Sequence, residues 1–169
     1  MSQHIGVIGL GSLGANMARL LAEDGYAVHA YDLDPARTAA AATTPGVTGH
    51  NSSRAVAENS TLVLLSLPQS EAVAAACLGP GGLIEGASRG LLVVDTTSGY
   101  PERTKEIAAE LAAAGVRYVD AAITSDEGGA KALPKRALTF CVGGGEADVA
   151  QPLPIPERMA LSVSPRRPL

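Results

Sequence analysis

Short runs of branched apolar residues alternate with alanine-rich segments along most of the chain. Six of these runs predict buried β-strands, at residues 5–10, 27–32, 61–67, 91–96, 116–122 and 137–144. Between the first two, Leu13, Met17, Leu20 and Leu21 recur at helical spacing, and Gly25 follows at a position typical of a helix C-cap. A second long helix is expected from Pro101, a favoured first-turn residue, to Gly115.

The order of these elements predicts the fold class. Strands that alternate with helices of this length favour right-handed βαβ crossovers, and therefore a mainly parallel, doubly wound α/β sheet with helices on both faces. We expect one domain over residues 1–150. Residues 151–169 bring prolines close together, and Pro154 and Pro156 would break a helix, so this segment is expected to be an irregular tail.

Composition and charge narrow the classes of partner. The chain has 169 residues, of which 46% are hydrophobic and 18% charged, with a formal net charge of -4. No basic cluster is larger than an adjacent pair such as Arg166–Arg167, which argues against nucleic acid and anionic membranes as partners. The first strand begins close to Met1 and no apolar stretch reaches the roughly 18 residues of a membrane span, so a cytoplasmic protein is expected.

The cysteines and histidines suggest no metal. Cys77 and Cys141 lie far apart with no CxxC, and His4, His29 and His50 fall at no metal-ligand spacing with them. We predict two buried, reduced thiols and no metal site.

A glycine pattern stands where the first predicted strand meets the first predicted helix. In the spacing G-x-G-x-x-G it comprises Gly9, Leu10, Gly11, Ser12, Leu13 and Gly14. The first glycine permits a tight turn, the second lets the backbone approach a pyrophosphate, and the third lets the helix pack close to the strand. The helix N-terminus would favour the diphosphate of a dinucleotide. The alternative is a glycine turn that serves packing alone.

Asp32 indicates which dinucleotide binds. It ends the second predicted strand, 23 positions after Gly9, where a carboxylate accepts hydrogen bonds from the adenosine ribose. The same charge repels the 2′-phosphate of NADP, so NAD is the expected cofactor and NADP the less favoured one. Arg37 weakens the argument for NAD over NADP, because its side chain would pair with a 2′-phosphate. The alternative is that Arg37 is simply solvated. The alternative role for Asp32 is that of a strand-end turn former.

Two further segments complete a family pattern. They are "LLSLP", which ends in Leu67 and Pro68, and "VDTTSGYP", which contains Thr97 and Ser98. With the glycine segment, they make nearly the whole chain resemble the β-hydroxyacid dehydrogenases, which include 3-hydroxyisobutyrate dehydrogenase, tartronate semialdehyde reductase and the cofactor domain of 6-phosphogluconate dehydrogenase. The resemblance implies a Rossmann-type fold.

The resemblance also implies roles for these residues. Leu67 and Pro68 would border the adenosine half of the cofactor, and the hydroxyls of Thr97 and Ser98 would lie near the nicotinamide. The alternative for the two hydroxyls is capping of the helix that begins at Pro101.

A third segment, "VDAAITSDEGGAKALPKRALTFCVGG", resembles the family's substrate loop in altered form. If residues 125–127 are an insertion, Thr124 takes the family's serine place and Gly128 and Gly129 its glycine pair. Without a gap, Ser125 and Asp126 would replace the glycines. Acidic side chains beside this loop would oppose an anionic substrate.

The resemblance implies that the family's catalytic lysine and helical domain follow this region, beyond Leu169. We therefore expect a cofactor-binding domain of an enzyme that transfers hydride between a nicotinamide and a short β-hydroxy acid or semialdehyde, with no catalytic residue in this chain and no turnover by it alone. The alternative is a stand-alone dinucleotide-binding module. A homo-oligomer is compatible with either function.

Overall fold

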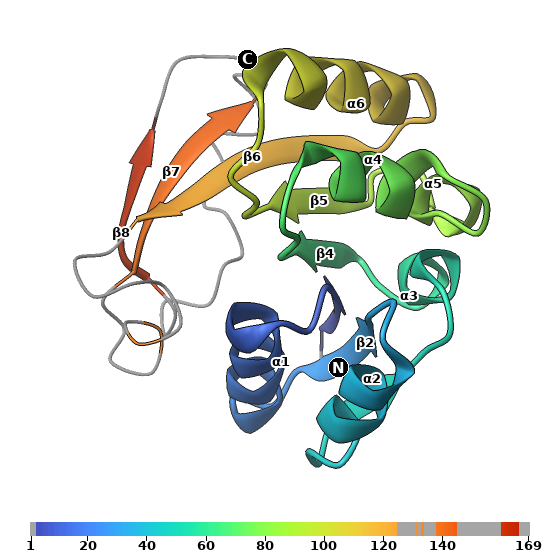
Figure 1. The fold of residues 1–169 in the computed structure, drawn as a ribbon, viewed down its shortest axis with the longest axis vertical. Helices are drawn as coiled ribbons and strands as arrows, with labels where there is room; N and C mark the ends of the chain where they lie inside the picture. The colour runs from blue at the N-terminus through green and yellow to red at the C-terminus, as the bar shows by residue number, and fades with distance from the viewer. Residues whose placement is uncertain (1–2, 125–130, 132, 134–137, 145–159, 166–169) are drawn as a thin grey trace.

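A computed structural model of the chain describes residues 3–124, 131, 133, 138–144 and 160–165. Within these residues, one eight-stranded sheet forms the centre of the molecule (Figure 1). Its strands are β1 (His4–Ile8), β2 (Ala27–Tyr31), β3 (Val47–Gly49), β4 (Leu62–Leu65), β5 (Leu92–Asp95), β6 (Arg117–Thr124), β7 (Leu138–Gly144) and β8 (Ala160–Pro165).

Across the sheet, the strands follow the order β3-β2-β1-β4-β5-β6-β7-β8. Neighbours from β3 to β6 pair in parallel, whereas β7 runs antiparallel to β6 and β8 runs parallel to β7. The chain thus builds outward from β1 in one direction and from β4 in the other. Open α/β sheets bind ligands at such a junction, beyond the carboxyl ends of the strands.

Six helices connect the strands within the described ranges: α1 (Ser12–Glu23), α2 (Pro35–Ala41), α3 (Ser53–Glu58), α4 (Ser70–Leu78), α5 (Leu83–Gly86) and α6 (Pro101–Ala113). Local sequence explains several of their ends. The side chains of Asp34 and Ser52 cap α2 and α3 by accepting from backbone N–H groups. Gly25 and Gly115 follow α1 and α6 with φ of 88° and 78°, which L side chains rarely adopt.

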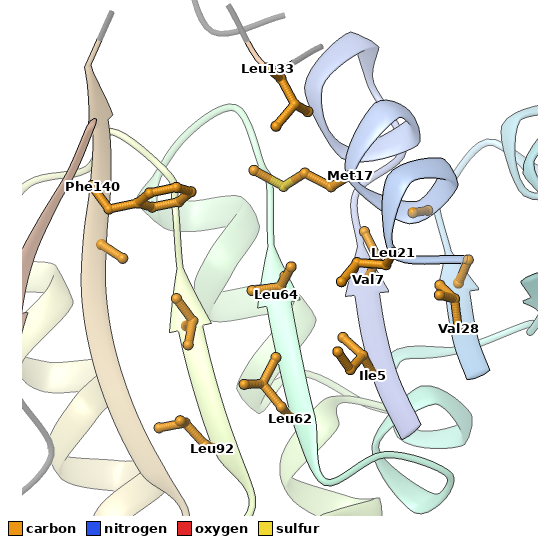
Figure 2. Close-up of a cluster of buried hydrophobic side chains, with 14 of the residues drawn as sticks. Ile5, Val7, Met17, Leu21, Val28, Leu62, Leu64, Leu92, Leu133 and Phe140 are labelled. Carbon is orange, nitrogen blue, oxygen red and sulfur yellow. The ribbon is translucent and has the colours of Figure 1, made fainter. Parts of the chain in front are cut away.

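The sheet has an apolar core on each face. On one face, Met17, Ala18 and Leu21 of α1 pack against alternate residues of the strands, and Figure 2 shows this core extending to Phe140 of β7. The other face is covered by buried side chains of α3, α4, α5 and α6. This division confirms the predicted doubly wound α/β class, and all six predicted strands and both predicted helices are present.

Two strands, β3 and β8, were not predicted from the sequence. β3 has only three residues, too few for a hydrophobic pattern to stand out. The prediction that residues 151–169 form an irregular tail is wrong for β8, which pairs with β7 at the edge of the sheet. The segment "ALSVSP" alternates apolar and polar residues as a strand does, and an edge strand tolerates a terminal proline. The domain limit at residue 150 stays a prediction.

The two cysteines differ in environment. Both are free thiols, and Cys77 is buried as predicted, but the prediction of burial is wrong for Cys141, which is only partly buried. Among the described residues, no cluster of His, Cys, Asp or Glu side chains could hold a metal ion. None of the helices in the same residues has the length and apolar character needed to cross a bilayer.

Candidate functional site

The candidate site lies at the carboxyl edge of the sheet, where β1, β2, β4 and β5 end side by side. The fold brings the G-x-G-x-x-G turn after β1 together with Asp32 after β2, Leu67 after β4 and Thr97 after β5. These residues come from four separate parts of the sequence, so the sheet order alone gathers them. These residues therefore surround the junction between β1 and β4, which is where an open α/β sheet is expected to bind a ligand.

Two of the three motif glycines are required by the protein itself. Gly9 has a φ of 92°, and a Cβ there would stand 2.2 Å from the Ser66 carbonyl oxygen. A Cβ on Gly14 would stand 1.9 Å from the Gly9 carbonyl oxygen, so only glycine allows α1 to approach β1 this closely.

Gly11 is different, because a Cβ there would meet nothing within 4 Å. Its φ of -64° is accessible to any residue. Neither packing nor backbone conformation therefore explains this glycine. A side chain here would fill open space before the N-terminus of α1, where a pyrophosphate would approach the backbone.

The N-terminus of α1 is prepared for an anion. Gly11 is its N-cap and offers no side-chain cap, and the first turn holds no acidic residue. In helix geometry, the first backbone N–H groups have no partner within the helix and carry the positive end of its dipole. Two phosphate groups with suitably placed oxygens would fit these donors.

The Asp32 carboxylate lies one residue after β2 and is mostly shielded, with 10% of the side chain exposed. Its Oδ2 accepts from the Leu10 N–H at 2.6 Å, and its Oδ1 accepts from the Asp34 N–H at 2.9 Å. The carboxylate thus also ties the glycine turn to β2, as the turn-forming alternative expected. Each oxygen retains a further lone pair for a ribose hydroxyl.

Arg37 lies beside this carboxylate on the exposed side of α2. Its Nη1 is 3.7 Å from Asp32 Oδ2, and its Nε is 3.7 Å from Asp34 Oδ2. The guanidinium is 55% exposed, so these ion pairs contribute little to stability and leave the side chain free to move.

Hydroxyl side chains in the segment after β5 form hydrogen bonds with the end of β4 and with the loop that follows it. The Leu67 N–H donates to Thr97 Oγ1 at 3.2 Å, and Thr96 Oγ1 donates to the Leu65 carbonyl at 2.7 Å. Pro68 and Ser98 are exposed on this edge. The capping alternative finds no support, since the N-cap of α6 is Tyr100 and no side chain caps it.

A buried polar pair under this turn was missed at the level of sequence. Asp95 Oδ1 accepts from the Thr97 N–H at 2.9 Å, and Asp95 Oδ2 accepts from the Tyr118 hydroxyl at 2.5 Å. Burial raises the pKa of the Asp95 carboxyl, while these hydrogen bonds oppose that shift, and burial also raises the pKa of the Tyr118 hydroxyl. The sequence feature that could have revealed this pair is an aspartate at the end of an otherwise apolar strand.

The substrate-loop residues are only partly described. Thr124 ends β6, where it is exposed and pairs with Thr139 of β7. Gly128 and Gly129 lie outside the described residues, so their relation to Thr124 stays a prediction. Leu133 of the same segment is buried in the core beside Met17 of α1 (Figure 2), which brings this part of the segment back to the helix that follows the glycine turn.

Comparison with known sequences finds relatives that match most of the chain. The sequence profile of the NAD binding domain of 6-phosphogluconate dehydrogenase matches residues 4–165. A 2-(hydroxymethyl)glutarate dehydrogenase of Eubacterium barkeri is 36% identical over 146 residues, covering 86% of this chain and 47% of the relative. A 3-hydroxyisobutyrate dehydrogenase of Pseudomonas aeruginosa is 30% identical over 159 residues, covering 94% of this chain and 52% of the relative.

Comparison with solved structures agrees. The 3-hydroxyisobutyrate dehydrogenase of Mycobacterium tuberculosis, solved with L-serine, superposes with a TM-score of 0.87 and 25% identity, over 99% of this chain and 55% of that chain. The chain therefore spans about half the length of the relatives that it matches.

Proposed function

The chain belongs to the family of NAD-binding domains found in 6-phosphogluconate dehydrogenase, and from this premise we propose that it is the cofactor-binding half of a hydroxyacid dehydrogenase that prefers NAD to NADP. The observation that carries the proposal is Gly11, whose missing side chain leaves space before α1 that the protein does not use. When bound, the nicotinamide would supply the hydride acceptor or donor. The glycine turn would hold the pyrophosphate by its backbone N–H groups.

The preference for NAD rests on Asp32. Its carboxylate stands after β2 and is positioned by two backbone N–H groups, so it is held in place before a cofactor arrives. It would accept from the ribose hydroxyls of NAD and repel the 2′-phosphate of NADP. Arg37 is the residue that would instead favour the 2′-phosphate of NADP. In this structure its guanidinium already lies 3.7 Å from the carboxylates of Asp32 and Asp34.

Calorimetric titration with NADH and with NADPH tests this preference. We expect NADH to bind about tenfold more tightly or better, which corresponds to about 1.4 kcal/mol. Asp32→Asn should narrow the gap to within about threefold, because NADH loses a charge-assisted hydrogen bond while NADPH is relieved of repulsion. Arg37→Ala is the matched control and should leave the affinity for NADH unchanged. Equal affinities in the wild-type chain would overturn the role proposed for Asp32.

The substrate side of the proposal rests on the exposed end of β6. Thr124, with Gly128 and Gly129, would bind the carboxylate of a short hydroxy acid or semialdehyde through its hydroxyl and the glycine N–H groups. The names of the relatives support this class of substrate, since they describe dehydrogenases of small hydroxy acids. The catalytic acid and the closure of the site would come from outside residues 1–169, and assembly into a homo-oligomer would accompany the whole enzyme.

A further inference from the structure

The turn after β5, which contains Thr97, is hydrogen-bonded to a polar pair inside the core. Asp95 and Tyr118 are 4% and 6% exposed, so their polar atoms are almost completely withdrawn from water. Burial of an ionisable pair is unfavourable unless each polar atom has a partner. A buried pair at this edge of the sheet therefore calls for a physical reason.

The register of the sheet explains how the two side chains meet. Val93 of β5 pairs with Tyr118 of β6, and Asp95 pairs with Asp120, in parallel register. Side chains two residues apart on a strand lie on the same face, so Tyr118 and Asp95 are diagonal neighbours on the face that α4 and α6 cover. The tyrosine reaches along the strand, and its hydroxyl lies 2.5 Å from Asp95 Oδ2.

The other carboxylate oxygen acts on the turn itself. Asp95 Oδ1 accepts from the Thr97 N–H at 2.9 Å, and the Thr97 Oγ1 accepts from the Leu67 N–H at 3.2 Å. A continuous series of hydrogen bonds therefore runs from Tyr118 on β6 through Asp95 and Thr97 to the loop after β4. Among the described residues, no salt bridge is formed by Asp95, so hydrogen bonds with Tyr118 and Thr97 hold this carboxylate in place of a counter-ion.

The position of this hydrogen-bond series is next to the place where one end of a bound dinucleotide would lie. Asp32 and β2 lie on one side of the junction between β1 and β4, where the adenosine ribose would bind. The loops after β4 and β5 lie on the other side, so the nicotinamide half of a dinucleotide that crosses the junction would lie against the Thr97 turn.

We propose that Tyr118 and Asp95 are positioning residues for the nicotinamide half of the cofactor, because together they fix the Thr97 turn against which that half lies. The proposal rests on the proposed function. It predicts that loosening the pair weakens contacts with the nicotinamide while the adenosine half keeps its own contacts with Asp32 and the glycine turn.

The test compares two ligands, NADH and ADP-ribose, which lacks the nicotinamide. In Tyr118→Phe the ring stays in the core and only the hydroxyl is lost. We expect the affinity for NADH to fall about fivefold to tenfold, as for one net hydrogen bond, while the affinity for ADP-ribose stays within about twofold of wild type. Asp95→Leu should show the same selective loss, because a leucine side chain can accept from neither Tyr118 nor Thr97.

Tyr26→Phe is the matched control, since Tyr26 is partly buried against the other core at the amino end of β2, and both affinities should be unchanged. Equal losses of NADH and ADP-ribose affinity in Tyr118→Phe would mean general loosening of the fold and would overturn the proposal, as would no loss of either. If wild-type protein binds ADP-ribose and NADH equally well, the turn makes no contact and the proposal also falls. Failure of the wild-type chain to bind either ligand would instead remove the proposed function on which the inference rests.

Discussion

At the scale of single residues, the three motif glycines have three different physical reasons. Gly9 is required by its positive φ and by the Ser66 carbonyl, and Gly14 by the contact between α1 and β1. Gly11 has no such reason within the protein, which makes it the most informative of the three. A glycine with no structural need of its own is what a ligand that approaches the backbone would require.

This difference predicts opposite behaviour in two variants. Gly11→Val is expected to abolish NADH binding, since its side chain enters the space before α1, while changing stability by only about 1 kcal/mol, the size of an N-cap effect. Gly14→Ala should instead lower the free energy of unfolding on the order of 1–3 kcal/mol, because its Cβ overlaps the Gly9 carbonyl. Calorimetry and urea unfolding of both variants separate the two effects. Normal NADH affinity in Gly11→Val would show that the glycines serve packing only.

At the scale of elements, β1, β2 and the end of β3 are linked by three histidines. His4 Nδ1 lies 3.0 Å from His29 Nε2, and His29 Nδ1 lies 2.9 Å from His50 Nε2. His29 is 9% exposed, and burial, followed by the nearby His50 and His4, lowers its pKa from 6.5 to about 4. The side chains that α3 buries here are Ser53, Val56 and Ala57, none of them charged.

The histidine chain makes stability depend on pH. Because the folded-state pKa of His29 lies below its ordinary value, the folded chain binds fewer protons than the unfolded chain. The stability due to neutral His29 is complete above pH 6.5 and is lost as the pH falls from about 6.5 to about 4, by up to about 3 kcal/mol. The lowered pKa of His50 acts in the same direction.

Urea unfolding at pH 7.5 and pH 4.5 measures this dependence in wild type and in His29→Leu, which cannot titrate at this position. The wild-type free energy of unfolding is expected to fall by about 2–3 kcal/mol more than that of the variant. Parallel decreases in the two proteins would show that carboxylates elsewhere cause the acid sensitivity.

The elements also show what a single sequence can and cannot predict. Apolar runs such as those of β1 and β4 are buried on both faces, and their hydrophobic pattern is unmistakable. β8 was missed because the surrounding prolines outweighed a short alternation, and its pairing with β7 is a long-range event. The contacts between Tyr118 and Asp95 and between His29 and its neighbours depend on strand register, which no local pattern reveals.

At the scale of the whole molecule, the described residues form a complete doubly wound sheet with a core on each face. The edge that we propose for the cofactor offers the N-terminus of α1 and the carboxylate of Asp32. A hydride transfer also needs a proton donor or acceptor for the substrate oxygen and a site closed to water. The relatives are about twice as long as this chain, so they contain room for both outside the part that matches.

We therefore expect that a polypeptide of residues 1–169 binds NADH but has no measurable dehydrogenase activity. The sequence has three lysines, of which Lys105 and Lys131 are exposed and Lys135 lies outside the described residues. Loss of a general acid lowers rates by about 10²–10⁴, and loss of substrate orientation lowers them further, so turnover should stay below about 0.01 per second. NADH formation from 3-hydroxyisobutyrate, glycerate and hydroxybutyrate is the measurement, with NADH binding by the same preparation as the control for a folded site. Turnover above about one per second would show that a lysine of this chain, or of a second copy, supplies the proton.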